Sequence, residues 1–113
     1  MLTTHIQIAG KEYPINFGLA CLAELEQEFS CGIAELGERL QASGISGIAR
    51  LAHIGIKHGH RVTKQPFEQT LEDTCDLLDN EGFAVIDKVT KILEQSMNMQ
   101  AGAGQKKTRA AGR

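Results

Sequence analysis

Three of the four histidines, His53, His58 and His60, lie close together in the sequence, and imidazole is both a common metal ligand and a proton carrier. A separation of five residues places His53 and His58 about 140° apart around a helix, so the two rings do not face one metal ion. His58 and His60 flank a glycine, but no Asp, Glu or Cys lies within several residues of them to complete a ligand set. We therefore expect no metal site and interpret these histidines as solvated residues near a helix end.

The other side chains that could take part in catalysis form no recognisable catalytic motif. The chain has no nucleophile elbow, no phosphate-binding glycine loop and no HExxH helix. We expect no enzymatic activity and no cofactor. The carboxylates occur at positions that project from helices towards water, which predicts solvated acidic faces at Glu24, Glu26, Glu28, Glu72, Asp73, Asp76 and Asp79.

The cysteines and the N-terminus indicate an intracellular protein. Cys21, Cys31 and Cys75 are odd in number and form no CxxC pair, which is typical of reduced thiols in the cytosol. The first residues lack the basic start and apolar run of a signal peptide, and no apolar run reaches the roughly 20 residues that span a bilayer. We expect a soluble protein.

The net charge of −2 is unevenly distributed along the 113 residues. Residues 101–113 contain four basic residues and no acidic one, so the remaining 8 basic and 14 acidic residues give the body a charge of −6. The C-terminal segment also lacks any apolar residue larger than alanine. This composition predicts a flexible, disordered basic tail at 101–113, following a single small helical domain with an N-terminal hairpin at 1–100.

The chain begins with two short runs of alternating polarity, which predict a β-hairpin with a type II′ turn at Gly10-Lys11. Pro14 has no N–H to donate, so the second strand is expected to be an edge strand. An isolated hairpin is only marginally stable, so it must pack on the helices or gain a strand from another chain. The apolar faces of the two strands comprise Ile6 and Ile8, and Tyr13, Ile15 and Phe17.

The periodicity of the remaining sequence predicts about five helices, at 19–29, 33–41, 46–58, 71–78 and 83–100. The fold class is therefore α+β and predominantly helical. Helix 46–58 is apolar around most of its circumference and is expected to be central, with Gly59 as its terminator. Thr70 and Asp73 have the spacing of a capping box. The first helix is expected to bury Leu19, Leu22, Leu25 and Phe29.

The last helix has an apolar arc of about 200°, twice the width that a surface helix needs to cover one core. One stripe is assigned to the core and comprises Phe83, Ile86, Leu93 and Met97. The neighbouring stripe is either sandwiched or meets another chain, and we favour association with a partner or a second copy. The predicted partner-binding residues are Val85, Val89, Ile92 and Met99.

The pattern as a whole resembles the tail assembly chaperones of long-tailed bacteriophages. The likeness covers residues 5–97, and its elements are apolar spacings and turns rather than catalytic signatures. It is carried by Ile6-Gln-Ile-Ala-Gly-Lys-Glu-Tyr-Pro-Ile-Asn-Phe-Gly18, Leu22-Ala-Glu-Leu-Glu26, Leu51-Ala-His-Ile-Gly-Ile-Lys-His-Gly59 and Thr70-Leu-Glu-Asp73 with the closing helix.

The resemblance implies a non-catalytic protein of the bacterial host cytoplasm that binds the tape measure protein, recruits tail tube protein and is absent from the mature virion. It also implies a mostly helical fold with a small β element, and homo-oligomers. Many such genes yield a longer product by frameshifting, and Gln105-Lys-Lys107 is compatible with an A-rich slippery codon run.

Two alternative functions belong to other classes of protein. A small phage or prophage regulatory protein would bind nucleic acid through its basic tail, because Lys and Arg bind phosphate without sequence specificity. The tail has no aromatic residue to stack on bases, however, and the acidic body makes nucleic-acid binding unlikely. An enzyme that uses the histidine cluster is the least favoured of the three.

Overall fold

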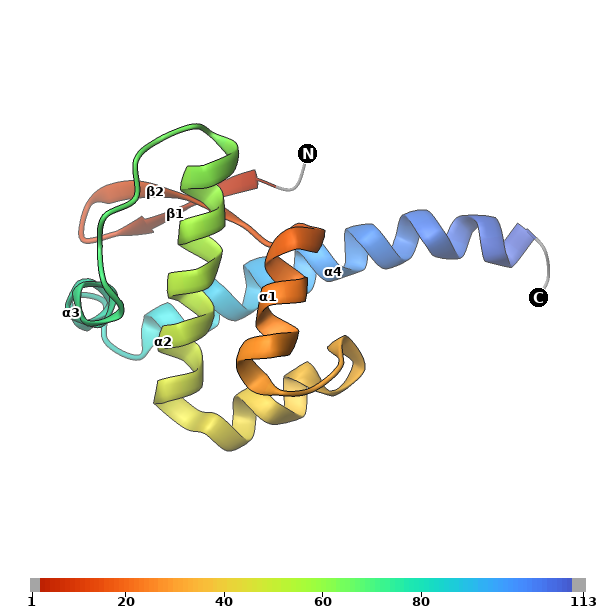
Figure 1. The fold of residues 1–113 in the computed structure, drawn as a ribbon, viewed down its shortest axis with the longest axis horizontal. Coiled ribbons are helices and arrows are strands. Elements are labelled where there is room, and N and C mark those ends of the chain that lie inside the picture. Colours follow the sequence, from red (N-terminus) through yellow and green to blue (C-terminus); the bar gives the residue numbers. More distant parts are fainter. Residues whose placement is uncertain (1–2, 111–113) are drawn as a thin grey trace.

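The computed structural model describes residues 3–110, with side chains described as far as residue 98. The fold is α+β and mostly helical, as predicted: an N-terminal two-stranded hairpin is followed by four α-helices and one short 3₁₀ turn (Figure 1). The elements in chain order are β1 (Thr3–Ile8), β2 (Lys11–Asn16), α1 (Leu19–Phe29), η1 (Ile33–Glu35), α2 (Leu36–Val62), α3 (Leu71–Asp79) and α4 (Ala84–Ala110).

The hairpin turns at Ala9-Gly10, one residue earlier than predicted. Both residues have positive φ, 56° and 80°, as a type I′ turn requires, so the prediction of a type II′ turn was wrong. The turn closes on the pair Ile8–Lys11, and the strands are antiparallel. Ile6 and Ile8 lie on the buried face, as expected from their alternation.

Pro14 lies where its missing N–H is useful. It is opposite His5, and pairs alternate between hydrogen-bonded and non-hydrogen-bonded in an antiparallel ladder that starts at the turn. Pro14 therefore directs its ring nitrogen and carbonyl away from β1, towards helix α2. Any other residue here would direct a backbone N–H at the last turn of α2, where the carbonyls already accept hydrogen bonds from the residues that follow the helix.

Helix α2 touches this outer edge of β2 through two glycines. A Cβ at Gly59 would lie 2.2 Å from the Pro14 carbonyl oxygen and 2.6 Å from the Ile15 nitrogen. A Cβ at Gly55 would lie 2.7 Å from the Phe17 ring. Only glycine permits this approach. Gly59 is thus not the predicted terminator, and α2 continues three residues beyond it to Val62.

The predicted break before residue 46 is present, but as a kink within α2. Gly44 has φ 63° and ψ −140°, a conformation that is essentially restricted to glycine. The helices predicted at 33–41 and 46–58 are consequently η1 and the two halves of α2. The chain changes direction sharply between these halves (Figure 1).

Helix ends follow the local signals. Thr70 and Asp73 form the predicted capping box, because each side chain accepts from the other residue's backbone N–H at 3.1 and 2.9 Å. Helix α1 ends at Ser30 in the left-handed conformation. Leu22, Leu25 and Phe29 are buried as expected, whereas Leu19, in the first turn of α1, is 74% exposed.

Polar contacts near the hairpin turn set the rotation of α4 about its axis. The Lys88 ammonium donates to the Gln7 carbonyl at 3.0 Å and to Glu81 Oε1 at 2.7 Å, while Ala9 N–H donates to Glu81 Oε2 at 3.0 Å. These bonds turn the Lys88 side of α4 towards β1. Val85, Val89 and Leu93, on another side of α4, are buried in the core.

The C-terminal part of α4 differs from the predicted disordered tail. The described backbone remains helical to Ala110, although the helix was expected to end near Gln100, and this part projects beyond the other elements (Figure 1). Ala, Gln, Lys and Arg are good helix formers, which favours the continuation. Residues 111–113 lie outside the described residues.

We predict that Gly59→Ala lowers the free energy of unfolding by at least about 2 kcal/mol, because the obstructing atoms are backbone and cannot rotate away. The matched control is Gly37→Ala, since a Cβ at this helical position meets nothing within 4 Å. The control should stabilise the protein by about 0.5–1 kcal/mol. Urea denaturation measures both values, and equal effects would contradict the proposed close approach.

Candidate functional site: an apolar groove along α4

Within the described residues, an apolar groove lies between α4 and the elements around the α2 kink. It consists of two adjoining cavities of about 890 and 310 Å³, which share the side chains of Ile45, Ile48 and Ile86. The larger cavity is lined by η1, the first half of α2 and α4. The smaller one lies between α2, α3 and the start of α4.

Around α4, the buried stripe and the groove wall are adjacent. Val85, Val89 and Leu93 follow each other at four-residue intervals and are 4, 0 and 5% exposed. At 100° per residue, Ile86 and Met97 lie on the next sector of the helix and line the groove. The helix therefore has two apolar sectors, one for the core of this chain and one that remains accessible.

This arrangement matches the predicted core stripe in part, since Leu93 is buried as expected and Ile86 and Met97 pack half-buried against the core. Val85 and Val89, predicted to bind a partner, are buried in this chain's own core, and Val85 also lines the smaller cavity. Ile92 is half-buried and packs against the same core. The side chain of Met99 lies outside the described residues. Phe83, assigned to the core, is instead 77% exposed. The reason is the rotation of α4, which depends on its contacts with β1.

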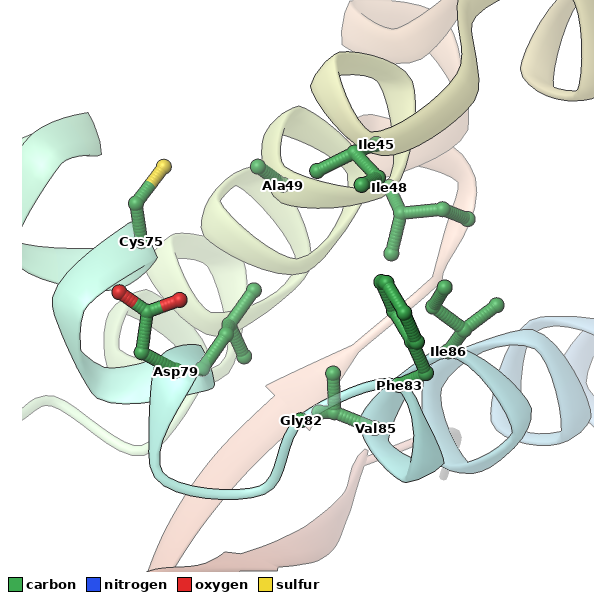
Figure 2. Close-up of a pocket in the computed structure, with 10 residues that line it drawn as sticks. Ile45, Ile48, Ala49, Cys75, Asp79, Gly82, Phe83, Val85 and Ile86 are labelled. Carbon is green, nitrogen blue, oxygen red and sulfur yellow. The ribbon is translucent and has the colours of Figure 1, made fainter.

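Two large apolar side chains at the groove are strongly exposed. Ile45, immediately after the Gly44 kink, is 65% exposed and faces Phe83 across the smaller cavity. Figure 2 shows Phe83 and Ile86 pointing from α4 towards Ile45 and Ile48 of α2, with Cys75 on the α3 side. Exposed apolar side chains gathered at a hollow are typical of a binding surface rather than of a solvated one.

The groove residues were misassigned from the sequence, although one signal pointed to them. The second half of α2 is buried at Leu51, Ala52, Ile54 and Ile56, as expected for a central helix, whereas Ile45 beside the kink is exposed; α4 carries apolar residues on more than its buried stripe. On α4 this excess predicts association with another chain, which stays a prediction. Ile45 was missed, and Phe83 was placed in the core.

The histidines are part of the folded body, not solvated loop residues as expected. His58 lies within α2 and is 7% exposed, and its Nε2 is 2.7 Å from Glu24 Oε1 on α1. Lys57 donates to the other Glu24 oxygen at 2.6 Å, and Arg61 donates to His58 Nδ1 at 3.1 Å. The interpretation of Glu24 as a purely solvated carboxylate was therefore wrong, since it joins α1 to α2.

His53 and His60 hold the loop that connects α2 to α3. Their rings lie on either side of Phe67, with centroid distances of 5.3 and 5.2 Å. His53 Nδ1 is also 2.8 Å from Thr74 Oγ1. Burial, followed by the charge of Lys57, lowers the pKa of His53. Within the described residues, no three His, Cys, Asp or Glu side chains are grouped to hold a metal ion.

The cysteines are free thiols. Burial raises the pKa of Cys21 to about 12, and the nearby Glu24 charge acts in the same direction. Because the thiolate is the reactive form, this thiol is unsuited to nucleophilic chemistry at neutral pH.

We predict that Glu24→Gln destabilises the protein above about pH 5 and that its effect shrinks as the pH falls. Burial alone would raise the pKa of Glu24, but the hydrogen bonds and charges of Lys57 and His58 outweigh it and hold that pKa below 4.5. A lowered pKa stabilises the fold above the unfolded-state pKa and is lost as the group protonates.

Thermal melts at pH 3–7 measure this effect. Glu68→Gln, an exposed change in the loop between α2 and α3, serves as the control and should parallel the wild type. A Glu24→Gln deficit that is the same at pH 3 and pH 7 would contradict the ionic origin of the contact.

No family model, curated protein or solved structure matches this chain in comparisons with each of these groups. Across the part of the chain that was searched, no helix is long and apolar enough to cross a membrane. The groove is therefore interpreted from its own geometry.

Proposed function

We propose that this protein is a non-catalytic tail assembly chaperone of a long-tailed phage or prophage, and that the groove along α4 binds a helical segment of the tape measure protein. The observation that carries the proposal is the groove itself: a continuous apolar hollow whose most exposed side chains are Phe83 and Ile45. The sequence resemblance supplies the identity of the partner.

The construction of the groove favours a helix as its occupant. Its walls are helices, whose backbone groups are bonded internally, so an extended peptide would find no strand edge to pair with. From its start at Ala84 to Met97, the α4 wall is about 20 Å long, which matches almost four turns of a partner helix. An amphipathic helix can bury its apolar face there against both walls.

The exposed side chains can supply much of the binding energy. Burying a large apolar side chain contributes about 1.5–3 kcal/mol, and Phe83 and Ile45 are both mostly exposed in the single chain. Aromatic anchors near the centre of an interface frequently dominate its affinity. By keeping tape measure helices covered until the tail tube encloses them, such a groove would act as a holding site.

The proposal extends to the setting of that activity. The chaperone would act in the cytoplasm of the bacterial host, contact tail tube protein as a second partner, form homo-oligomers and leave before the virion is complete. These statements rest on the family resemblance.

We predict that Phe83→Ser combined with Ile45→Ser weakens binding of tape measure fragments at least about tenfold, because two apolar anchors are lost. Both side chains are exposed, so the melting temperature should change little. Fragments of the tape measure protein from the same genome would be co-expressed, and complexes quantified by size-exclusion chromatography and titration calorimetry.

Leu19→Ser is the matched control, since Leu19 is 74% exposed and lies on α1 outside the groove. It should leave binding unchanged. Undiminished binding by the groove double variant, with normal folding, would reject the groove as the chaperone site.

We predict that deleting residues 101–113 leaves both the melting temperature and tape measure binding nearly unchanged, because this segment has no large apolar residue to bury. Under the regulatory alternative, the wild type would bind DNA in a salt-sensitive way and the deletion would abolish it. Electrophoretic mobility shifts at two salt concentrations distinguish these outcomes.

A further inference from the structure

The charged residues that line the groove are all acidic. Four carboxylates belong to the lining of the two cavities, and neither lining contains a Lys or Arg. The four come from three different helices, so their shared sign is a property of the folded surface rather than of one sequence run. They are Glu38 on α2, Asp79 at the end of α3, and Asp87 and Glu94 on α4.

These carboxylates form the rim of an apolar floor. On α4, Asp87 and Glu94 lie on the sector just beyond Phe83, on the side away from the buried stripe. All four carboxylate residues are exposed, and within the described side chains none of them makes an ion pair or a hydrogen bond. The rim charge is therefore not neutralised by the chain itself.

One cation, Lys91 of α4, lies at helical spacing from Asp87 and Glu94, but among the described side chains it forms no ion pair with either of them; three others are committed elsewhere. Lys57 pairs with Glu24, Arg50 lies 3.5 Å from Glu28, and Lys88 points to β1 on the opposite side of α4. The body carries a net charge of −6. A groove of this kind attracts positive charge both at the rim and at longer range.

We propose that the groove selects basic amphipathic helices: the apolar face of the bound helix seats between α2 and α4, and Lys or Arg residues beside that face meet the four carboxylates. The inference rests on the groove being the partner site of the proposed function, and it defines the class of segment bound there. Complementary charge adds discrimination and association rate more than raw affinity.

A second copy of this chain is a poorer occupant. Its body is equally acidic, so two bodies repel each other across the rim. Its basic segment at 101–113 has the right charge but contains no apolar residue larger than alanine, so it cannot fill cavities lined by Ile, Leu and Phe side chains. A helix from another protein that combines an apolar face with flanking positive charges can fill the apolar cavities and pair with the carboxylates at their rim.

The test uses fluorescein-labelled synthetic peptides of 18 residues and the full-length protein. All carry Leu at helical i, i+3, i+4 and i+7 positions, and the flanking positions are Lys in one peptide and Glu in the other. A third peptide has the composition of the Lys peptide in scrambled order. By fluorescence anisotropy, the Lys peptide should bind about tenfold tighter than either of the others, and the preference over Glu should fall as NaCl is raised.

Variants of the protein test which residues cause the preference for the Lys peptide over the Glu peptide. Glu38→Gln, Asp87→Asn and Glu94→Gln together should reduce the Lys-over-Glu preference several-fold, whereas the control pair Glu72→Gln and Asp76→Asn, exposed carboxylates outside the groove, should preserve it. Phe83→Ser should weaken binding of the Lys peptide. Equal binding of Lys and Glu peptides, equal binding of the scrambled peptide, or an unchanged preference in the triple variant would each overturn the proposal.

The experiments distinguish a failure of the basic-helix inference from a failure of the proposed chaperone function. If tape measure fragments bind through Phe83 but the peptides show no charge preference, the chaperone role stands and the basic-helix inference falls. If the Lys peptide binds with the stated dependence while no tape measure fragment binds, the inference stands and the proposed partner is wrong.

Discussion

The close approach of α2 to β2 is the contact on which the rest of the structure depends. Gly55 and Gly59 remove the side chains that would hold the helix away from the strand, and Pro14 removes the donor that the helix could not satisfy. The hairpin is thereby anchored without a third strand. Since α1, α3 and α4 also contact α2, the position of this helix against the hairpin determines where each of them lies.

The groove is a consequence of two departures from regular packing. The kink at Gly44 directs the first half of α2 away from the line of its second half, so α4 cannot pack along both. The contacts of Lys88 and Glu81 with the hairpin then fix which sector of α4 faces inward. The apolar sector beside it stays accessible. A binding surface thus arises from the same bonds that stabilise the fold.

The sequence predicted what depends on neighbouring residues and failed where distant contacts decide. Fold class, strand alternation, the break near Gly44 and the capping box of Thr70 follow from local periodicity and turn chemistry. The rotation of α4 depends on a bond between residues 81 positions apart, Lys88 and Gln7, and periodicity alone cannot choose between two adjacent apolar stripes. The structure buries Val85 and exposes Phe83, which was expected in the core, and the predicted association through this helix stays a prediction. The close contact of Gly59 with β2 could not be predicted either, because the sequence does not distinguish a glycine that ends a helix from one that packs against a strand.

The bond from Lys88 to the Gln7 carbonyl has a further consequence for how the protein behaves at high concentration. Gln7 directs this carbonyl outward from β1, at the edge where another strand would add. A lysine ammonium on that acceptor occupies a ladder position and places a positive charge at the edge, two devices by which natural sheets avoid edge-to-edge aggregation. The residue that orients α4 therefore also discourages the hairpin from templating sheet growth. The protein can in this way expose its apolar groove to a partner without also exposing a strand edge that would promote aggregation.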